Sequence, residues 1–558
     1  MKLDDKDLLL QRAYANAKNY ADRTYMTQPI GGGQVDVFSW ARTFDEAKRM
    51  AAHLRSLDLP AGSKIAILSK NCAHFILADL AIWMAGHVSV AIYPTLDAET
   101  VQYVLEHSES KLIFVGKLDI YDEMAPGIPA DLPRVCFPLA PKHAEGTPWK
   151  AILDSNEPIA DEPTRDADDL AILVYTSGST GWPKGVMHTF RTMSIATVGV
   201  HKTLDIGPGD RMLSYLPLAH VMERWIVETS SLVAGFKVFF AESLDTFVTD
   251  LQRASPTMFV SVPRLWLKFQ LGVFKKMPAK KLSRLLKIPL INNVIRKKVL
   301  GGLGLAECRF AGTGSAPLPA EVIEWYQNLG LELLEAYGMT ENFAYSHLSV
   351  PGKARAGYVG NTQLWVEHRI SEEGEILVKS PASMIGYYKQ EELTAASFTE
   401  DGFLKTGDRG ELDAQGRLKI TGRVKELFKT SKGKYVAPAP IENLINNDGK
   451  LELSCVFGSG RVKACAVINL AEDLRDQVSD PKVRAEVEAG LAELLKRTNE
   501  ELVPHERLAF LAVAKEPWTI ANGCLTPTMK IKRAKIEERY SPSLDEWYAA
   551  NKPVLWQD

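Results

Sequence analysis

Residues 170–185 read Leu-Ala-Ile-Leu-Val-Tyr-Thr-Ser-Gly-Ser-Thr-Gly-Trp-Pro-Lys-Gly. The apolar run Leu170–Tyr175 predicts a buried strand. The loop that follows, Tyr175–Gly185, contains four Ser or Thr hydroxyls, three glycines and one lysine. Small residues let backbone N–H groups approach a phosphate, hydroxyls add hydrogen-bond donors, and a lysine adds positive charge. We therefore expect this loop to hold the β- and γ-phosphates of ATP.

The loop is not a Walker A loop, because no Gly-Lys-Ser or Gly-Lys-Thr follows Gly178 at the required spacing. From this stretch alone, the alternative is an ordinary solvated turn between a strand and a helix. The rest of the chain has to decide between the two.

Short apolar runs lie on both sides of this stretch. We expect strands at Lys64–Leu68, Val88–Tyr93, Lys111–Val115, Lys237–Ala241 and Thr257–Val262, with helices between them. Strands that alternate with helices of this length are typical of parallel sheets covered by helices. The expected fold class is therefore α/β, with a large N-terminal domain of parallel or mixed sheets. Ligands of such sheets bind at the carboxyl ends of the strands.

Two local patterns add to this picture. Thr43-Phe-Asp-Glu46 matches a capping box and predicts a helix from there to about Leu57. The run Leu333–Tyr337 ends in Gly-Met-Thr-Glu and should bring a second loop to the ligand-binding edge of a sheet.

The character of the chain changes near residue 400. Residues Asp401–Val436 are dense in Gly, Asp, Lys and Arg, which favours hairpins, and Leu451–Phe457, Val462–Leu470 and Pro481–Glu500 predict two strands and a helix. We place a domain boundary near Lys425, giving an N-terminal domain of residues 1–423 and a small α+β C-terminal domain of residues 424–558. A domain of that size is viable.

Charge is unevenly distributed. The 558 residues carry a net charge of −3, which does not predict nucleic-acid binding. No acidic residue lies between Asp250 and Glu307, whereas twelve Lys and Arg residues fall within 253–298. This stretch could be a solvated face whose acidic partners come from elsewhere in the sequence. It could also make peripheral contact with an anionic membrane, since each basic residue contributes about 1 kcal/mol near such a surface.

Composition also bears on location. The six cysteines are scattered with no Cys-x-x-Cys pair, which favours neither a zinc site nor a disulfide framework and suggests a reducing compartment. The N-terminus lacks the apolar core of a signal peptide. The most membrane-like stretch, Phe75–Tyr93, is interrupted by Asp79, Gly86 and His87. We expect a cytoplasmic protein, with membrane-peripheral contact as the hypothesis above.

Seven motifs occur in order along the chain. They are Tyr175–Gly185, Tyr215–Arg224, Gly312–Pro317, Ala336–Glu341, Lys405–Asp408, Gly422–Lys425 and Leu525–Arg533. In this order and spacing they resemble the adenylate-forming (AMP-binding, acyl-CoA synthetase and luciferase-like) superfamily, over about residues 40–535. Leu216–Arg224, Phe428–Pro438 and Leu525–Arg533 look most like the long-chain fatty acyl-CoA synthetases. Met529 stands where many relatives have glycine.

The resemblance implies a reaction in two steps. The carboxylate of a fatty acid would attack the α-phosphorus of ATP to give acyl-AMP and pyrophosphate, and the thiol of coenzyme A would then displace AMP. ATP, Mg²⁺ and coenzyme A are the implied cofactors. Two anions meet in the first step, so catalysis depends mainly on charge neutralisation and alignment.

The resemblance also implies the residues that hold the nucleotide. The pyrophosphate portion of ATP would contact Thr176, Ser177, Gly178, Ser179, Thr180 and Lys184. Glu341 would ligate Mg²⁺, with Thr176 as a second ligand. Adenosine would contact Tyr337, Gly338 and the backbone of Gly314, Ser315 and Ala316, while Asp408 and Arg423 would bind the ribose.

Further roles concern catalysis and movement. Lys530 and Thr340 would contact the α-phosphate, and His220 would lie beside the acyl carboxylate. In the second step the small domain would rotate about a hinge at Lys425, removing Lys530 and bringing Gly433 to the coenzyme A tunnel. Trp266 would gate a fatty-acyl tunnel, although a tryptophan on an apolar helix face is usually a core residue.

The leading interpretation is an AMP-forming long-chain fatty acid:CoA ligase. A medium-chain or aryl acid:CoA ligase, and an acyl-AMP ligase that delivers to a carrier protein, stay open as alternatives. A catalytically inactive nucleotide-binding protein is disfavoured, because Thr340, Glu341, Asp408 and Lys530 are all present. Dimers occur in the superfamily, and an oligomer is left open.

Overall fold

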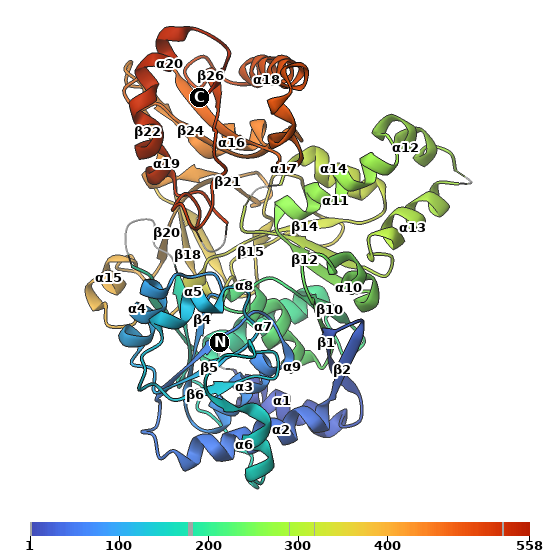
Figure 1. Cartoon of the computed structure of the whole chain (residues 1–558), viewed down its shortest axis with the longest axis vertical. Coiled ribbons are helices and arrows are strands. Elements are labelled where there is room, and N and C mark those ends of the chain that lie inside the picture. The colour runs from blue at the N-terminus through green and yellow to red at the C-terminus, as the bar shows by residue number, and fades with distance from the viewer. Residues whose placement is uncertain (1–2, 177–181, 290, 317, 527–528, 558) are drawn as a thin grey trace.

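The structure is a computed structural model that describes residues 3–176, 182–289, 291–316, 318–526 and 529–557. Figure 1 shows a large N-terminal part and a smaller C-terminal part placed at one end of it, with the C-terminus in the smaller part. This is the expected α/β class, with a separate small domain.

The central sheet has eight strands in the order β19-β9-β8-β4-β3-β5-β6-β7. Their bounds are β3 (Lys64–Leu68), β4 (Val88–Ile92), β5 (Leu112–Val115), β6 (Arg134–Cys136), β7 (Thr147–Pro148), β8 (Leu170–Thr176), β9 (Lys184–Thr189) and β19 (Gly386–Tyr387). Strands β3, β4, β5 and β8 run parallel, as predicted. Strand β9 pairs antiparallel with β8, with Thr176 opposite Lys184. The loop between them therefore closes a hairpin and does not lead directly into a helix.

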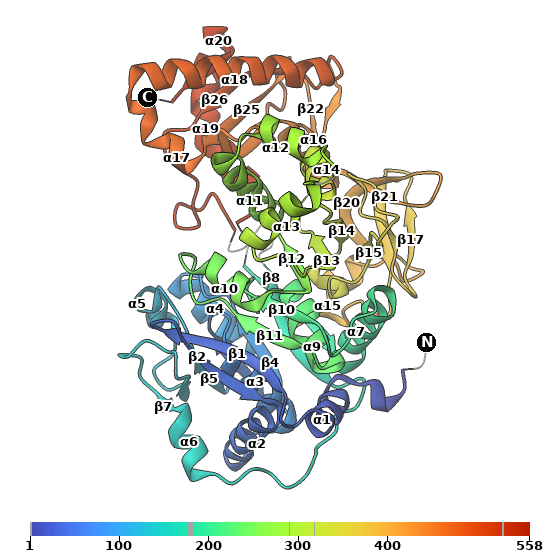
Figure 2. The same ribbon diagram turned by 90° about the vertical axis from the view of Figure 1, so that its right-hand side faces the viewer.

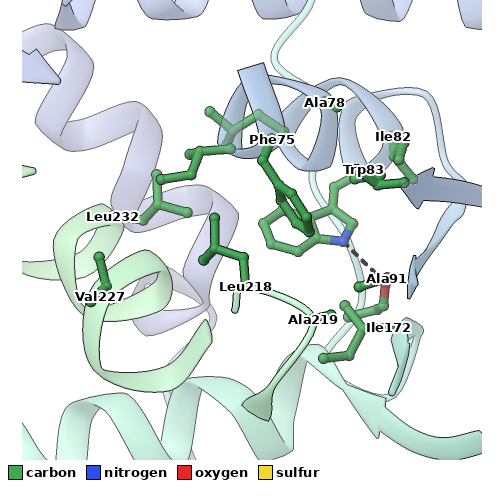
Figure 3. Close-up of a cluster of buried hydrophobic side chains, with 14 of the residues drawn as sticks. Phe75, Ala78, Ile82, Trp83, Ala91, Ile172, Leu218, Ala219, Val227 and Leu232 are labelled. Carbon is green, nitrogen blue, oxygen red and sulfur yellow. Dashed lines mark hydrogen bonds between the residues drawn. The ribbon is translucent and has the colours of Figure 1, made fainter. Parts of the chain in front are cut away.

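The face of this sheet is covered by α3 (Ala73–Met84), every residue of which is buried. Figure 3 shows Phe75 and Trp83 of α3 packed against Ile172 of β8, and Trp83 Nε1 donates to the carbonyl of Ala171 over 3.1 Å. Because α3 is covered on all sides, its sequence is apolar all round the helix, which explains why it looks membrane-like. In the described part of the chain, no helix combines the length and the apolar character needed to cross a membrane.

The predicted capping box at Thr43 is wrong. Helix α2 (Trp40–Ser56) begins earlier, and its N-cap is Ser39, whose hydroxyl accepts from Arg42 N. Thr43 lies inside the helix and donates to the carbonyl of Ser39 over 2.8 Å. The earlier start buries Trp40, which stacks on Tyr25 with ring centroids 3.9 Å apart.

Three further sheets complete the N-terminal part. The first has the order β12-β13-β14-β15-β16, with β12 (Met258–Ser261), β13 (Phe310–Thr313), β14 (Leu333–Tyr337), β15 (His347–Leu348) and β16 (Asn361–Thr362). The second contains β10 (Arg211–Ser214), β11 (Lys237–Phe240), β1 (Thr24–Gly31) and β2 (Gln34–Ser39). The third contains β17 (Glu367–Ile370), β18 (Glu375–Lys379), β20 (Leu404–Leu412) and β21 (Leu418–Arg423). Strands β12, β13 and β14 run parallel, so their carboxyl ends share one edge.

The remaining helices of this part surround the sheets. They are α1 (Leu9–Asn19), α4 (Ala98–Ser108), α5 (Tyr121–Met124), α6 (Trp149–Ser155), α7 (Phe190–Leu204), α8 (Val221–Glu223), the π-helix η3 (Arg224–Thr229), α9 (Ser230–Ala234), α10 (Phe247–Ala254), α11 (Pro263–Lys276), α12 (Ala279–Leu286), α13 (Asn292–Gly302), α14 (Ala320–Asn328) and α15 (Glu391–Ala396). In Figure 1, α12 and α13 project to one side of the molecule.

The small C-terminal domain has its own core. A sheet of β24 (Leu451–Phe457), β25 (Ala464–Leu470), β26 (Leu508–Val513) and β27 (Val554–Trp556) packs with α16 (Pro438–Ile445), α18 (Pro481–Glu501), α19 (Arg533–Tyr540) and α20 (Leu544–Ala550). A short hairpin, β22 (Phe428–Lys429) and β23 (Tyr435–Val436), and α17 (Glu472–Arg475) complete it.

The two parts touch along α11 (Figure 2). Arg264 forms an ion pair with Glu452, and Lys275 with Asp473 over 2.8 Å. These contacts hold the C-terminal domain over the edge where β12, β13 and β14 end. The boundary between residues 423 and 424 stays a prediction; Arg423 is the last residue of β21.

Candidate active site

The phosphate loop is anchored at both described ends. Thr176 ends β8 and Lys184 begins β9, directly opposite. Lys184 Nζ lies 5.5 Å from the ring centroid of Tyr387 in β19. The predicted phosphate-binding residues Ser177, Gly178, Ser179 and Thr180 lie outside the described residues. The pairing places Thr176 and Lys184 side by side at the end of the β8–β9 hairpin, and their phosphate-binding roles stay a prediction.

Trp182, for which the sequence offered no role, belongs to an aromatic stack. Its ring stacks on Tyr103 of α4 at 4.7 Å, and Tyr103 stacks on His107 at 5.3 Å. His107 Nδ1 and the hydroxyl of Tyr175 form a 2.7 Å hydrogen bond. The stack thus joins the two ends of the phosphate loop through α4.

We predict that Trp182→Ala weakens ATP binding. Stacking of this kind contributes about 0.5–1.5 kcal/mol, so the KM for ATP should rise roughly two- to tenfold while the KM for the acid changes little. Steady-state kinetics of pyrophosphate release measures both constants. Trp182→Phe keeps a stacking ring and should behave as the wild type; an equal effect from both substitutions would contradict the stacking argument.

Thr340 and Glu341 follow β14 in a short 3₁₀ helix, Thr340–Asn342. His188 Nε2 donates to the carbonyl of Thr340 over 2.7 Å, and the N–H of Met384 donates to the carbonyl of Glu341 over 2.7 Å. Burial lowers the pKa of His188 to about 4, so the ring is neutral at physiological pH and Nε2 carries its proton. The segment that contains Thr340 and Glu341 is therefore held by hydrogen bonds from two sides: from His188 in β9 and from Met384, two residues before β19.

The side chain of Glu341 accepts a hydrogen bond from the hydroxyl of Tyr387 over 2.7 Å. Tyr387 therefore touches both Glu341 and Lys184, and joins the expected metal ligand to the phosphate loop. The backbone can take this path only with glycine at position 338, because a β-carbon there would lie only 2.4 Å from the carbonyl oxygen of Ala344.

Tyr337, Asp408 and Arg423 come together as a triad. The Tyr337 hydroxyl donates to Asp408 Oδ2 over 2.8 Å, and Arg423 Nε lies 3.1 Å from Asp408 Oδ1. Asp408 and Arg423 are direct partners across β20 and β21. Burial and the Asp408 carboxylate raise the pKa of Tyr337, so its proton stays in place. This geometry suits an aromatic platform beside an acceptor for sugar hydroxyls.

Gly314, Ser315 and Ala316 follow β13 on the same edge as Tyr337. Ser315 and Ala316 are exposed, and Ser315 adopts a left-handed backbone with φ of 68°. The exposed backbone can lie along a nucleotide.

Lys530 reaches this edge from the C-terminal domain. It directly precedes Ile531, which bridges to Leu525, and Thr526 Oγ1 accepts from Lys530 N over 3.1 Å. Met529 has φ of 62°, a conformation that favours glycine, which explains why glycine suits this position. Part of the Lys530 side chain stays exposed.

Three charged groups influence Lys530: Arg423 and Asp408 from the paired strands β21 and β20, and Glu341 from the segment after β14. Burial and the nearby Arg423 lower the pKa of Lys530, while Asp408 and Glu341 act in the opposite direction. Burial, and then Lys530 itself, lower the pKa of His220 to about 4. Asp408, Glu341 and His220 therefore each lie within electrostatic reach of Lys530.

His220 begins α8 as its N-cap, and its Nδ1 accepts from Met222 N over 3.1 Å. Nε2 therefore carries the proton of the neutral ring. Glu223, in the same motif, accepts from the Ser214 hydroxyl (2.8 Å) and the Tyr215 N–H (3.0 Å), and burial raises its pKa to about 8. Glu223 thus ties α8 to the end of β10 and positions His220.

Arg224 completes the motif as a structural residue. It is fully buried, and its Nη1 lies 3.0 Å from Asp79 and 3.3 Å from Glu228. Although burial opposes its charge, Asp79 and Glu228 raise its pKa. The cluster of Arg224, Asp79 and Glu228 links α3 to the π-helix. The sequence alone does not show this link, because Asp79 lies far from the other two residues along the chain.

An apolar cavity lies behind the nucleotide edge. It is lined from α7 and the π-helix on one side and from β12, β13, β14 and β15 on the other; the lining residues include Val200, Leu204, Trp225, Ile226, Gly314, Leu334 and Ala336. Gly314 and Ala336 also belong to nucleotide motifs, so the cavity starts at the expected reaction site. It can hold the hydrocarbon part of an acid.

Three predicted residues lie away from this cluster. Trp266 is fully buried in a second core and donates from Nε1 to the carbonyl of Gly312 over 3.2 Å. It is not among the residues lining the cavity. Gly433 lies exposed at the tip of the β22–β23 hairpin, and Lys425 is exposed in the segment after β21. Their gate, coenzyme A and hinge roles stay predictions.

Glu341 is the residue expected to ligate Mg²⁺, and its surroundings bear on that role. The described residues include no group of three or more His, Cys, Asp or Glu side chains placed to hold a metal ion. Glu341 offers one carboxylate beside the phosphate loop, and Mg²⁺ commonly binds through one or two carboxylates plus substrate phosphates.

Comparison with known proteins identifies the class. The model of the AMP-binding enzyme family matches residues 13–388, and that of the AMP-binding enzyme C-terminal domain matches residues 426–552. The chain belongs to the AMP-binding enzyme family.

Particular relatives are similar over most of their length. The long-chain-fatty-acid–CoA ligase FadD15 of Mycobacterium bovis is 28% identical, covering 98% of this chain and 97% of the relative. The long-chain-fatty-acid–CoA ligase 1 of Homo sapiens is 29% identical, covering 88% and 78%. The adenylation domain of a carboxylate reductase from Mycobacterium chelonae superposes with a TM-score of 0.81 at 22% identity, covering 97% and 91%, which shows a shared fold.

Proposed function

We propose that this enzyme is an AMP-forming fatty acid:CoA ligase that acts on long-chain acids. The observation that carries the proposal is an apolar cavity whose lining includes Gly314 and Ala336 of two nucleotide motifs. Lys530 from the C-terminal domain lies within electrostatic reach of Asp408, Glu341 and His220. A nucleotide site that opens onto an apolar cavity suits a reaction between ATP and an acid with a hydrocarbon chain. The similarity to fatty-acid–CoA ligases supports the same choice.

In the first step the acid's carboxylate attacks the α-phosphorus of ATP, and the bond to pyrophosphate breaks. Lys530 neutralises charge that develops on the α-phosphate, and Thr340 orients it from the β14 edge. Thr176 and Lys184 hold the departing pyrophosphate from the β8–β9 hairpin. Mg²⁺, when bound at Glu341, neutralises phosphate charge. His220 is neutral, so it can donate a hydrogen bond to the carboxylate without trapping it as an ion pair.

In the second step the thiol of coenzyme A attacks the acyl carbon, and AMP leaves. We propose that the C-terminal domain turns about Lys425 between the steps and brings Gly433 toward the thiol's path. The ion pairs of Arg264 and Lys275 with the C-terminal domain belong to the first orientation and would have to separate.

A panel of acids tests this function. Saturated acids of graded length, aryl acids and medium-chain acids are supplied with ATP, with and without coenzyme A, and AMP and thioester are measured. The proposal expects kcat/KM to be highest for long-chain acids and thioester to need coenzyme A. Preference for aryl or medium-chain acids, or acyl-AMP without thioester formation, would replace it with one of the alternatives.

The pH dependence of adenylation follows from Lys530. The charged ammonium is the active form, so kcat/KM should be full below the lowered pKa and fall as pH rises through it, earlier than for an ordinary lysine at 10.5. Lys530→Arg stays charged to above pH ~12, so its alkaline limb should disappear even if the rate is lower. Pyrophosphate release measured across the alkaline range checks this. If kcat/KM of Lys530→Arg fell at the same alkaline pH as that of the wild type, the fall would have to come from the titration of another group.

We also propose that α12 and α13 contact anionic membrane lipids. Of the twelve basic residues in 253–298, Arg253, Arg264 and Lys275 pair with acids, and Arg296 donates to a carbonyl. The other eight have no acidic partner within 4.0 Å in the described ranges; they are Lys268, Lys276, Lys280, Lys281, Arg284, Lys287, Lys297 and Lys298. Ile288 and Val294 are 44% and 64% exposed among them. Unpaired basic charge around exposed apolar side chains is what an anionic lipid surface attracts.

Co-sedimentation with phosphatidylserine-containing vesicles at low salt tests this contact. Replacing Lys280, Lys281, Arg284 and Lys287 by Gln should weaken binding at least tenfold, since each charge contributes about 1 kcal/mol. A matched control replaces four exposed basic residues of α18, Lys482, Arg484, Lys496 and Arg497. No binding by the wild type, or equal loss in the control, would reject the membrane contact.

A further inference from the structure

Two residues that line the apolar cavity carry buried polar atoms without partners in the described part of the chain. Trp225 of the π-helix and Thr313 at the end of β13 both line it, and they are 5% and 2% exposed. Neither Trp225 Nε1 nor Thr313 Oγ1 has a hydrogen-bond partner within the described residues. Every other lining residue is apolar.

An unpaired N–H in such a place is unusual. A buried tryptophan N–H usually finds an acceptor, and leaving a buried donor unpaired is unfavourable. Trp266 shows the ordinary case in this protein, since its Nε1 donates to the carbonyl of Gly312. The indole of Trp225 packs edge-on against Tyr345, at 6.0 Å between ring centroids, and its N–H has no hydrogen-bond partner among the described residues.

The two orphan atoms lie close to the reaction end of the cavity. A β-carbon on Gly314, in the nucleotide motif, would lie 3.9 Å from the sulfur of Met222. Trp225 follows Met222 by three residues, about one helical turn or roughly 5 Å. Thr313 is the immediate neighbour of Gly314. An acyl chain that enters past Gly314 therefore meets both residues within its first several carbons.

The chemistry of the lining limits the group that can be recognised. Among the described residues no charged side chain lines the cavity, so a second carboxylate or an amine would be buried without a counter-charge. A neutral oxygen satisfies an N–H donor without that cost. A hydroxyl or oxo group meets both requirements.

We propose that the preferred acyl group carries a neutral oxygen, as a hydroxyl or oxo substituent near its carboxyl end, which accepts a hydrogen bond from Trp225 Nε1. Thr313 Oγ1 supplies a second polar contact from the β13 side of the cavity. This inference rests on the proposed function, because it assigns the cavity to the acyl group. It narrows the substrate class from fatty acids to oxygenated fatty acids.

Paired acids of equal length test the inference. Each 3-hydroxy or 3-oxo acid is compared with its unsubstituted parent by kcat/KM for acid-dependent pyrophosphate release. The wild type should favour the oxygenated acid roughly tenfold or more, because the parent leaves a buried donor unpaired. In Trp225→Phe, which removes only the donor from an aromatic side chain, the ratio should fall to about twofold or less.

Two further variants separate hydrogen bonding from shape. Thr313→Val should lower the ratio by a smaller factor, and Leu204→Ile, which changes the wall without a polar atom, should keep it. A wild-type ratio near one, or a ratio that survives in both Trp225→Phe and Thr313→Val, would overturn this inference while turnover of the parent acids still supports the ligase. Lack of turnover with every acid would overturn the proposed function and this inference together.

Discussion

Replacing Lys530 by Ala should lower the rate of acyl-AMP formation by about 10²–10³-fold, because one charged donor aimed at developing charge contributes that much in comparable sites. Lys530 belongs to the C-terminal domain, and its ammonium group lies within electrostatic reach of Asp408, Glu341 and His220 in the N-terminal part. Single-turnover formation of acyl-AMP from ATP and acid, measured by quenching, gives the rate directly.

The same variant should convert supplied acyl-AMP and coenzyme A to thioester within about threefold of the wild-type rate, because Lys530 acts before pyrophosphate leaves. The matched control is Lys532→Ala, since Lys532 is an exposed lysine two residues along the same segment. Equal losses in the two steps would mean that Lys530 holds the structure of the site and does not act on the first step alone.

Replacing Arg224 by Met should destabilise the N-terminal part by about 3–5 kcal/mol, because it leaves Asp79 and Glu228 buried without their counter-charge. We expect the Tm to fall by about 5–10 °C. Burial and the neighbouring Asp79 already raise the pKa of Glu228, which favours its neutral form. Most of the lost stability should therefore come from the uncompensated charge of Asp79. Differential scanning fluorimetry measures the change.

A surface pair provides the comparison. Arg191 and Asp168 form an exposed ion pair of 2.7 Å, and Arg191→Met should leave the Tm close to that of the wild type because solvent screens the pair. Adding Asp79→Asn and Glu228→Gln to Arg224→Met should recover part of the lost Tm. A Tm for Arg224→Met as high as that of Arg191→Met would show that the buried cluster is not a stabilising unit.

Strand positions were predictable because burial on both faces leaves an unmistakable apolar run. Leu170–Tyr175 and Lys64–Leu68 lie within a residue of the strands observed. The start of α2 was wrong because Ser39 and Thr43 are both good cap residues. Which of the two residues caps the helix depends on whether Trp40 is buried, and that is decided by tertiary packing.

The same limit applies to the site. The motifs marked Glu341 and Lys184, but Tyr387, which touches both, comes from a strand whose pairing with β9 no local pattern shows. The motif that contains His220 also contains Glu223 and Arg224, and only the structure shows that Glu223 and Arg224 hold the helix that follows His220. Met529 has a positive φ. From the sequence, the only indication of this conformation is that many relatives have glycine at the position.

The central claim is that the chain joins the carboxylate of an acid to AMP. The most direct measurement mixes the enzyme with ATP labelled at the α-phosphate and a long-chain acid, without coenzyme A, and identifies the products by mass spectrometry. Our account predicts acyl-AMP and pyrophosphate in equal amounts, formed only when the acid is present. Formation of ADP, or release of AMP that does not depend on the acid, would contradict it.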